Sequence, residues 1–445
     1  MGFALSTWPC WAMVGGNVPA LSRREYVTMN GTSESLLYAG LFLPGDELAT
    51  PAALMKLWRS DLRESGQLAY GLQYLDNPHA IALNPQHLPL RREAFALGPR
   101  LVRDGGALPL TLKDALPDAW GRLVVSLELG GRIPGDRELL LLTNENRVGA
   151  MVFAETPEMP APSGLPHDDL AQLAEAARRL QYDMEIPAPL RRLLQRGGSL
   201  GGARPKASFT YDHALWLAKF PAAGDPVDVQ ILEAAMLGLA MQCGIRVPQF
   251  FTLPIGPGDN AFLSRRFDRF GPDSRHRLPF LSASALLDIP YESDAGSYVA
   301  LARELRRWSV APAADLAELF RRMVFNLLID NTDDHLKNHG VLHAGNGRYR
   351  LSPAFDVVPQ LTNLGYQMLS IDGSSQHSSL ELAIHAAPHF DLSVDQAHAI
   401  TRDLTGIVRN GWRVHAESSG VPDALRRRLE SCFARQGAIV GAESF

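Results

Sequence analysis

The stretch from Phe325 to Asp356 constrains the fold of this chain more than any other. An apolar run ends in a dense polar segment, and a strand-like run then leads to Asp356; the polar segment is Asn331-Thr332-Asp333-Asp334-His335-Leu336-Lys337-Asn338. The apolar residues before it recur at intervals of three and four, which predicts a buried helix that delivers the polar segment at its C-terminal end. The simplest interpretation is a turn after a helix, because Asp and Asn side chains bond nearby backbone in turns.

Three polar side chains of this stretch have the spacing of a phosphotransfer site. Asn338 follows Asp333 by five residues, and Asp356 lies beyond the next predicted strand. Protein kinases place a catalytic Asp, a metal-binding Asn and a second metal-binding Asp in this order. Mg²⁺ takes oxygen ligands and keeps several waters, so one Asn and one Asp suffice. Asp334 adjoins Asp333, and we choose Asp333 as the catalytic carboxylate because only it has the five-residue step to Asn338.

Composition bounds the class of protein. The chain has 445 residues, 46% of them apolar, enough for two or three domains or one large bilobal unit. Its 43 basic and 48 acidic residues give a net charge of −5, which argues against a dedicated nucleic-acid binder. No apolar run reaches the roughly 18 residues that a membrane span needs. Cys10, Cys243 and Cys432 lie far apart without metal-binding spacing, so we expect a reducing cytoplasm.

Residues 1–30 have no place in the predicted fold. The run from Phe3 to Val14 is apolar, but no positive residue precedes it and no clean cleavage site follows, so we do not interpret it as a signal peptide. We expect residues 1–30 to be a disordered extension that folding and activity do not need. Met29 lies just before the first regular strand and is a candidate natural start.

The first predicted unit, residues 31–155, is a sheet-rich subdomain. Strand-like runs at 36–43, 52–57 and 70–75 are separated by turn residues, and a helix begins within 116–122 before a last strand.

The second unit, residues 156–265, completes an N-terminal lobe and carries a glycine-rich segment. The segment runs from Gly197 to Ala207, and backbone N–H groups of such glycines can approach an anion closely. It is not a Walker A loop, because Pro205 precedes Lys206 and neither Ser nor Thr follows. A plain flexible linker is an equal alternative.

Two charged side chains after this segment have the places of a nucleotide-binding pair. Lys219 lies at the apolar end of the second of two predicted strands, 207–210 and 214–220. Glu233 lies beside the buried stripe of a predicted helix at 227–242. Kinases use a strand Lys that contacts the phosphates and pairs with a helix Glu. A surface Lys at a sheet edge and a solvated Glu are the alternatives.

The next strands predict where two lobes join. Residues 247–253 and 261–264 are strand-like. In this order Phe262 to Arg266 would be the hinge that receives an adenine ring through backbone groups, with Phe262, Ser264 and Arg266 beside the base. An ordinary exposed basic run is the alternative.

Residues 266–445 predict a helical lobe. The apolar rhythm persists from Leu316 to Leu328, and the turn Gly345-Asn346-Gly347 predicts a hairpin that aims Asp356 back beside Asn338. The predicted fold class is therefore α+β: a bilobal protein-kinase-like fold with a sheet-rich N-terminal lobe and an all-helical C-terminal lobe.

Four segments together resemble the HipA-type serine/threonine kinases, toxins of bacterial toxin–antitoxin pairs. The segments are Ser199–Lys206, Arg266–Arg269, Asn331–Asn338 and Ala354–Asp356. The resemblance covers residues 35–420, and its first and third segments are specific when taken together.

The resemblance implies a role for each matching position. Asp333 would be the catalytic carboxylate at the substrate hydroxyl, and Asn338 and Asp356 would bind magnesium. Lys219 would contact the ATP phosphates, and His335 would support the catalytic loop. For His335, bonding to local backbone alone is the alternative.

The glycine-rich segment would complete the ATP site. Gly201, Gly202, Ala203 and Lys206 would approach the phosphates. Ser199 would be the serine that family members phosphorylate on themselves, which ejects the loop and stops activity; a phosphate adds about −1.5 to −2 charge. A Ser that merely lines a glycine turn is the alternative.

The resemblance implies an ATP- and Mg²⁺-dependent serine/threonine protein kinase that arrests growth by phosphorylating a translation-related protein, such as an aminoacyl-tRNA synthetase. Its partner would be a small DNA-binding antitoxin. A small-molecule kinase and a catalytically weak co-repressor that docks on the antitoxin are the alternatives. We expect neither a membrane partner nor direct reading of nucleic acid, since no helix-turn-helix is evident.

Overall fold

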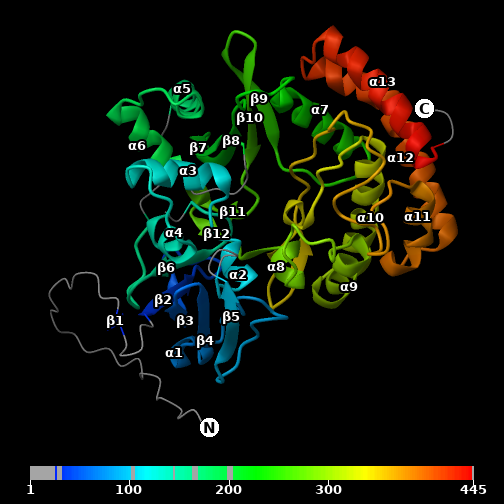
Figure 1. The fold of residues 1–445 in the computed structure, drawn as a ribbon. Coiled ribbons are helices and arrows are strands. Elements are labelled where there is room, and N and C mark those ends of the chain that lie inside the picture. The colour runs from blue at the N-terminus through cyan, green and yellow to red at the C-terminus, as the bar shows by residue number, and fades with distance from the viewer. Residues whose placement is uncertain are drawn as a thin grey trace.

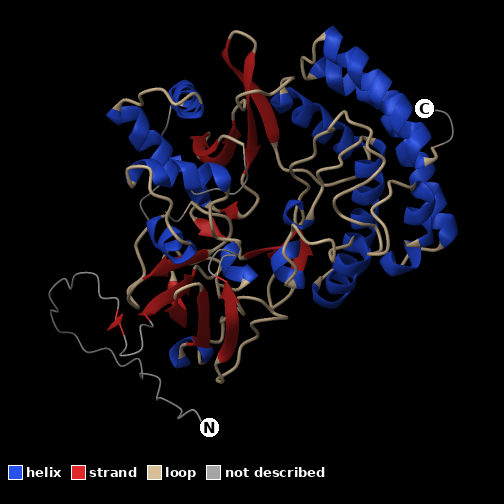
Figure 2. Ribbon diagram, in the orientation of Figure 1, coloured by secondary structure: helices blue, strands red, loops and turns tan. Residues whose placement is uncertain are grey.

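The computed structural model describes residues 26–27, 33–101, 106–143, 146–162, 169–197 and 204–442. It is a mixed α/β protein with antiparallel sheets, in which two sheets lie to one side and most of the long helices to the other (Figures 1 and 2). Apart from the short strand Tyr26–Val27, the predicted extension 1–30 lies outside the described residues. Within the described residues no helix is both long and apolar enough to cross a bilayer.

The N-terminal subdomain is built on an antiparallel sheet in the order β1-β2-β3-β4-β5, with β6 beside β2. Its elements are β1 (Tyr26–Val27), β2 (Ser33–Leu41), β3 (Thr50–Ser60), β4 (Arg63–Tyr70), α1 (Leu72–Leu75), β5 (Phe95–Leu101), α2 (Leu110–Lys113), α3 (Ala119–Glu128), α4 (Asp136–Leu142) and β6 (Met151–Ala154).

The predicted strand at 70–75 is wrong after its first residue. The strand ends at Tyr70, and Leu72–Leu75 forms one helical turn. The Tyr74 side chain is 1% exposed, and its hydroxyl donates to the Ile81 carbonyl at 2.8 Å. Burying this ring and satisfying its hydroxyl overrides the strand propensity of the run.

A second antiparallel sheet follows in the order β7-β8-β10-β9. Its strands are β7 (Lys206–Tyr211), β8 (Ala214–Lys219), β9 (Phe250–Gly256) and β10 (Asp259–Arg265), and its helices are α5 (Leu170–Gln181), α6 (Ala188–Gly197) and α7 (Val229–Gln242). The predicted strands at 207–210 and 214–220 and the predicted helix at 227–242 are thus confirmed.

The C-terminal part is mainly helical but is not all helix. Its elements are β11 (Arg269–Phe270), η2 (Pro272–Ser274), β12 (His276–Arg277), β13 (Phe280–Ser282), α8 (Ala283–Leu287), α9 (Tyr298–Trp308), α10 (Pro312–Leu328), η3 (Leu336–Asn338), β14 (Gly340–His343), β15 (Tyr349–Leu351), α11 (Leu380–His385), η4 (Ala387–Phe390), α12 (Val394–Ser418) and α13 (Asp423–Val440). The predicted hairpin is present as β14 and β15, and β13 pairs with β14 as a third antiparallel strand. The all-helical prediction is wrong, because the open edge of the hairpin takes a partner from far upstream.

The described residues form three hydrophobic clusters. One lies under the N-terminal sheet, one joins α3, α5 and α6 to the β7–β10 sheet, and the largest joins α7 to the C-terminal helices. Two helices therefore pack outside their predicted units. Trp120 of α3 packs with the β7–β10 sheet, and Leu232 of α7 packs with the C-terminal helices. The domain boundaries at 155 and 265 stay predictions.

Candidate active site

Lys219 lies at the centre of a buried ionic cluster. It ends β8, and its side chain is 8% exposed. Its Nζ donates to the two carboxylate oxygens of Glu233 at 2.7 and 2.8 Å and to Oδ1 of Asp356 at 2.8 Å. Burial opposes the charged form, but Asp356 and Glu233 outweigh it and raise the pKa of Lys219. The ammonium therefore stays charged, and its predicted pairing with Glu233 is present.

Glu233 reaches the lysine from a helix that is buried on all sides. Asp228 caps α7 by accepting from the N–H groups of Gln230 and Ile231. Every residue from Val229 to Ala240 is buried, and the Glu233 side chain is 4% exposed. The alternative of a solvated glutamate is thus wrong. Burial raises the pKa of Glu233, and the Lys219 ammonium opposes that effect.

Asp356, in the C-terminal part of the chain, contacts the same lysine, Lys219. Its backbone has φ of +60°, a left-handed conformation in which Asp is tolerated better than most residues. The side chain is 45% exposed, so solvent reaches it beside Lys219. The Lys219 ammonium, helped by Lys206, holds the pKa of Asp356 well below its usual range although the carboxyl is partly desolvated. The carboxylate is therefore ionised.

Asp333 and Asn338 lie together on the loop after α10. The Nδ2 group of Asn338 donates to the carbonyl oxygen of Asp333 at 3.3 Å. Asp333 is exposed at the surface of this loop. Partial burial and the negative charges of Asp356 and Asp334 nevertheless raise its pKa, against the effect of His335.

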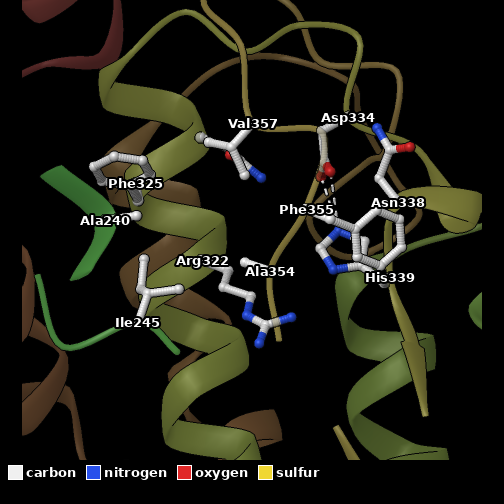
Figure 3. A pocket seen from close by; sticks show the side chains of 11 residues that line it. Ala240, Ile245, Arg322, Phe325, Asp334, Asn338, His339, Ala354, Phe355 and Val357 are labelled. Atoms are coloured by element: carbon white, nitrogen blue, oxygen red, sulfur yellow. Dashed lines mark hydrogen bonds and ion pairs between the residues drawn. The ribbon is translucent and has the colours of Figure 1, made fainter. Parts of the chain in front are cut away.

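Asp334 is a buried structural carboxylate. It is 3% exposed, accepts from the Tyr298 hydroxyl, and lies 3.0 Å from Nε2 of His339. Burial raises its pKa, but His339 and Tyr298 outweigh this and lower it. Figure 3 shows the contact between Asp334 and His339 in a pocket that Asn338 also lines. Both Asp334 oxygens are thus engaged in the interior, which favours Asp333 as the carboxylate available to a substrate.

Asp330 fixes the start of this loop. It is fully buried, with φ of +57°, and its Oδ2 accepts from the backbone N–H groups of Thr362 and Asn363 at 2.8 and 2.9 Å. It therefore joins the end of α10 to the segment that follows Asp356.

His335 supports the loop through its backbone and its ring. Its carbonyl accepts from the N–H of Asn338 at 2.9 Å, and its ring lies 4.9 Å from the ring of Tyr291. Its Nδ1 is buried without a hydrogen-bond partner among the described residues.

The glycine-rich segment is described only at its ends. Residues 198–203 lie outside the described residues, so the roles of four positions stay predictions: Ser199, Gly201, Gly202 and Ala203. Lys206 is described, and it pairs directly with Lys219 across β7 and β8. Directly paired residues of antiparallel strands project to the same face of the sheet. Burial lowers the pKa of Lys206, which is 7% exposed, whereas Asp356 favours its charge.

The expected free hinge at Phe262 to Arg266 is wrong. Phe262 and Ser264 each pair with a residue of β8 and a residue of β9, so both sides of β10 are occupied there. The N–H of Arg266 donates to the Leu215 carbonyl at 3.0 Å. This segment is the interior of a sheet, and its backbone groups are already hydrogen-bonded.

The Arg266 side chain faces the N-terminal subdomain rather than a nucleotide. Its Nε and Nη2 donate to Asp268 at 2.7 and 2.6 Å, and its Nη1 donates to the Asn146 carbonyl at 2.8 Å. Asp268 also contacts Arg269 at 2.9 Å and accepts from the Gly149 N–H at 2.7 Å. The segment 266–269 is therefore a buried structural cluster, and Arg266 does not serve the adenine site.

Sequence reasoning missed the residues that hold the loop from behind. Tyr298 and His339 contact Asp334, and the Tyr298 hydroxyl accepts from Asn326 at 3.0 Å. No spacing links Tyr298 to the loop, because the contact arises from packing of α9 on α10. His339 directly follows the motif and was the one available signal.

The described residues thus combine antiparallel sheets, a mainly helical C-terminal part and a contact of Lys219 with both Glu233 and Asp356. Residues 198–412 match the family model described as HipA-like C-terminal domain.

Two curated relatives come from Sinorhizobium fredii. Putative kinase Y4dM is 29% identical over 231 residues, which cover 47% of this chain and 54% of the relative, so the match spans about half of that protein's length. Putative kinase Y4mE is 26% identical over 393 residues, which cover 81% of this chain and 82% of the relative.

The fold is similar to that of a solved toxin–antitoxin protein. HipA from Shewanella oneidensis, in a complex with HipB and its operator DNA, superposes with a TM-score of 0.64 and 16% sequence identity, covering 91% of this chain and 96% of that one. At this identity the likeness concerns the fold.

Proposed function

We propose that this chain is an ATP- and Mg²⁺-dependent kinase that phosphorylates serine or threonine in a protein. The observation that carries the proposal is the contact of Lys219 with both Glu233 and Asp356, because it joins a strand lysine, a helix glutamate and a loop aspartate from separate parts of the chain. Phosphoryl transfer is catalysed mainly by positioning and electrostatic stabilisation, and the contacts among these three charges support a site of that kind. Relatives named as kinases support the same class.

The side chains divide the work of the reaction. Lys219, held by Glu233, contacts the phosphates, and Lys206 adds a second positive charge on the same face of the sheet. Asp333 orients the attacking hydroxyl and accepts its proton. Its raised pKa makes it a better proton acceptor than an ordinary Asp.

Asn338 and Asp356 fit a magnesium ion by their chemistry. The side-chain nitrogen of Asn338 donates to the Asp333 carbonyl, which leaves its side-chain oxygen for a metal. The Asp356 carboxylate is open to solvent and offers an oxygen as well. The described residues hold no group of three or more His, Cys, Asp or Glu side chains suited to a metal, and Mg²⁺ needs none because phosphates and water complete its shell. Bound there, the ion would neutralise charge on the phosphates.

Control by self-phosphorylation belongs to the same proposal. Ser199 lies between α6 and β7, directly before the segment that leads to Lys206. A phosphate on Ser199 would add about −1.5 to −2 charge to the glycine-rich segment, which would eject the loop and stop activity. Mass spectrometry of the chain after incubation with ATP and Mg²⁺ tests this, with Ser199→Ala as the control.

We further propose a toxin role with a small DNA-binding antitoxin as partner. The structurally similar HipA is in complex with HipB and operator DNA, which supports this assignment. The substrate would be a translation-related protein, with an aminoacyl-tRNA synthetase as one candidate.

Incubation of the purified chain with labelled ATP, Mg²⁺ and cell extract tests the activity. We expect label on protein with the wild type and none with Asp333→Ala. Label on a metabolite alone would establish a small-molecule kinase instead. Absence of ATP binding by calorimetry, with antitoxin binding intact, would establish a co-repressor.

A further inference from the structure

The first turn of α3 contacts both halves of the candidate active site, although it belongs to the N-terminal subdomain. Asp118, directly before the helix, accepts from Nζ of Lys337 at 2.7 Å. Two residues later, Nε1 of Trp120 donates to the carbonyl of Lys206 at 2.9 Å. One rigid helical turn thus holds the polar loop and the start of β7.

Asp118 occupies the N-cap position without capping its own helix. Asp at this position ordinarily accepts from backbone N–H groups of the first turn, but Asp118 makes no such bond. Its carboxylate reaches Lys337 instead, and the two side chains are 31% and 27% exposed. The local capping interaction is therefore replaced by a contact with a distant part of the chain.

Lys337 is fixed directly beside the proposed metal ligand. It lies in η3, the short helix that ends with Asn338, and its Nζ also lies 4.9 Å from the centre of the Tyr291 ring. Lys337 and Asn338 are consecutive residues of this short helix. The contact of Asp118 with Lys337 therefore restrains the position of Asn338 as well.

Trp120 fixes the other half of the site. The residue is 3% exposed and packs in the cluster that contains β7 and β8. Its bond to Lys206 lies at the first residue of β7, where the glycine-rich segment joins the sheet. The ring and its N–H thus fix the strand end that carries Lys206.

We infer that Asp118 and Trp120 are positioning residues that set the metal-binding loop at Asn338 against the phosphate-binding strand at Lys206. This inference rests on the proposed function. It gives the N-terminal subdomain a direct part in catalysis: α3 aligns the nucleotide phosphates with their metal ligands without touching either.

The test compares Asp118→Asn with Asp136→Asn. Asp136 of α4 accepts from Arg122 of α3 at 2.7 Å, and its side chain is 16% exposed. This ion pair joins α3 to α4 and not to the candidate active site, so Asp136→Asn is the control. We expect Asp118→Asn to raise the Mg²⁺ concentration for half-maximal phosphotransfer about 10-fold, the scale typical for residues that orient metal ligands. Asp118→Glu should retain wild-type behaviour, and Asp136→Asn should not change the Mg²⁺ requirement.

Trp120→Phe tests the second contact, with Trp216→Phe as its control. Trp216 is also buried, and its Nε1 donates to the Tyr211 carbonyl at 3.0 Å within the same sheet. We expect Trp120→Phe to raise the KM for ATP several-fold with a smaller change in kcat, and Trp216→Phe to leave KM unchanged.

Calorimetric titration with ATP and Mg²⁺ separates the two levels of the proposal. If the wild type binds ATP–Mg²⁺ and Asp118→Asn matches Asp136→Asn in its Mg²⁺ requirement, the positioning role is overturned and the kinase proposal stands. If the wild type binds no ATP–Mg²⁺, both are overturned. Should Asp118→Asn fail to fold, Lys337→Gln breaks the same contact from the other side and must give the same Mg²⁺ shift.

Discussion

Lys219 donates to Asp356 Oδ1 at 2.8 Å, a contact between residues 137 positions apart in the sequence. The same ammonium contacts both oxygens of Glu233, so one buried cation joins β8, α7 and the loop after β15. The charge of Lys219 therefore neutralises two carboxylates from separate parts of the chain.

Replacing Lys219 with Met should cost both ATP binding and stability. Glu233 would be left buried and unpaired, and breaking a buried ion pair costs about 3–5 kcal/mol. Urea unfolding measures the stability, and calorimetry measures the ATP affinity. The double variant Lys219→Met with Glu233→Gln should regain much of the stability but none of the ATP binding. Full ATP affinity in either variant would contradict the assignment of Lys219.

Asp333 and Asp334 should separate catalysis from stability. Asp333 is exposed, so Asp333→Asn should unfold like the wild type while phosphotransfer falls by about 10²–10⁴-fold, the usual contribution of a general base. Asp334→Asn should lower the melting temperature, because it weakens the buried contacts with Tyr298 and His339. Wild-type turnover by Asp333→Asn would transfer the catalytic role to another group.

The pH dependence of phosphotransfer should report the raised pKa of Asp333. The base acts only when ionised, so kcat/KM should fall as pH drops through that pKa, at a higher pH than for an ordinary Asp. His335 favours the ionised form of Asp333, so His335→Gln should move the acid limb to higher pH. A pH–rate profile of both proteins checks this, and an unmoved limb would show that another group titrates.

The cluster around Asp268 should govern acid stability. Burial opposes ionisation, but Arg266 and Arg269 outweigh it and hold the pKa of Asp268 well below its usual range. A depressed folded-state pKa stabilises the fold above the unfolded-state pKa, and this stabilisation is lost as pH falls through the folded-state pKa. Asp268→Asn should cost about 3–5 kcal/mol at neutral pH, and the deficit should shrink in acid.

Urea unfolding at pH 7 and at progressively lower pH measures that deficit. The control is Asp391→Asn, which removes an exposed pair with Arg306 and should cost about 1 kcal/mol or less. Equal losses in the two variants would show that the Asp268 cluster contributes no more than a surface pair.

The sequence predicted the elements that depend on neighbours along the chain. The sequence predicted the strand at 207–210, the strand that carries Lys219, the helix that carries Glu233 and the helix that ends at the polar loop, and all are present. The hairpin around Gly345-Asn346-Gly347 follows from turn chemistry.

The sequence failed where the outcome depended on distant partners. Arg266 was expected at a nucleotide, but its guanidinium is satisfied by Asp268 and by carbonyls of the N-terminal subdomain. The spacing to Asn338 favoured Asp333 over Asp334, but no local pattern indicated that Tyr298 and His339 bind Asp334 in the interior. β13 pairs with a hairpin far downstream, which no local pattern indicates.

The sequence by itself determined which chemical groups are present and in what order they come, because residue type, spacing and period are local properties. The tertiary structure alone decided that Lys219 is shared by two carboxylates, that Asp334 is buried, and that α3 contacts both Lys337 and Lys206. The physical reason is that burial and ion pairing depend on distances through space, which packing sets between residues far apart in the chain.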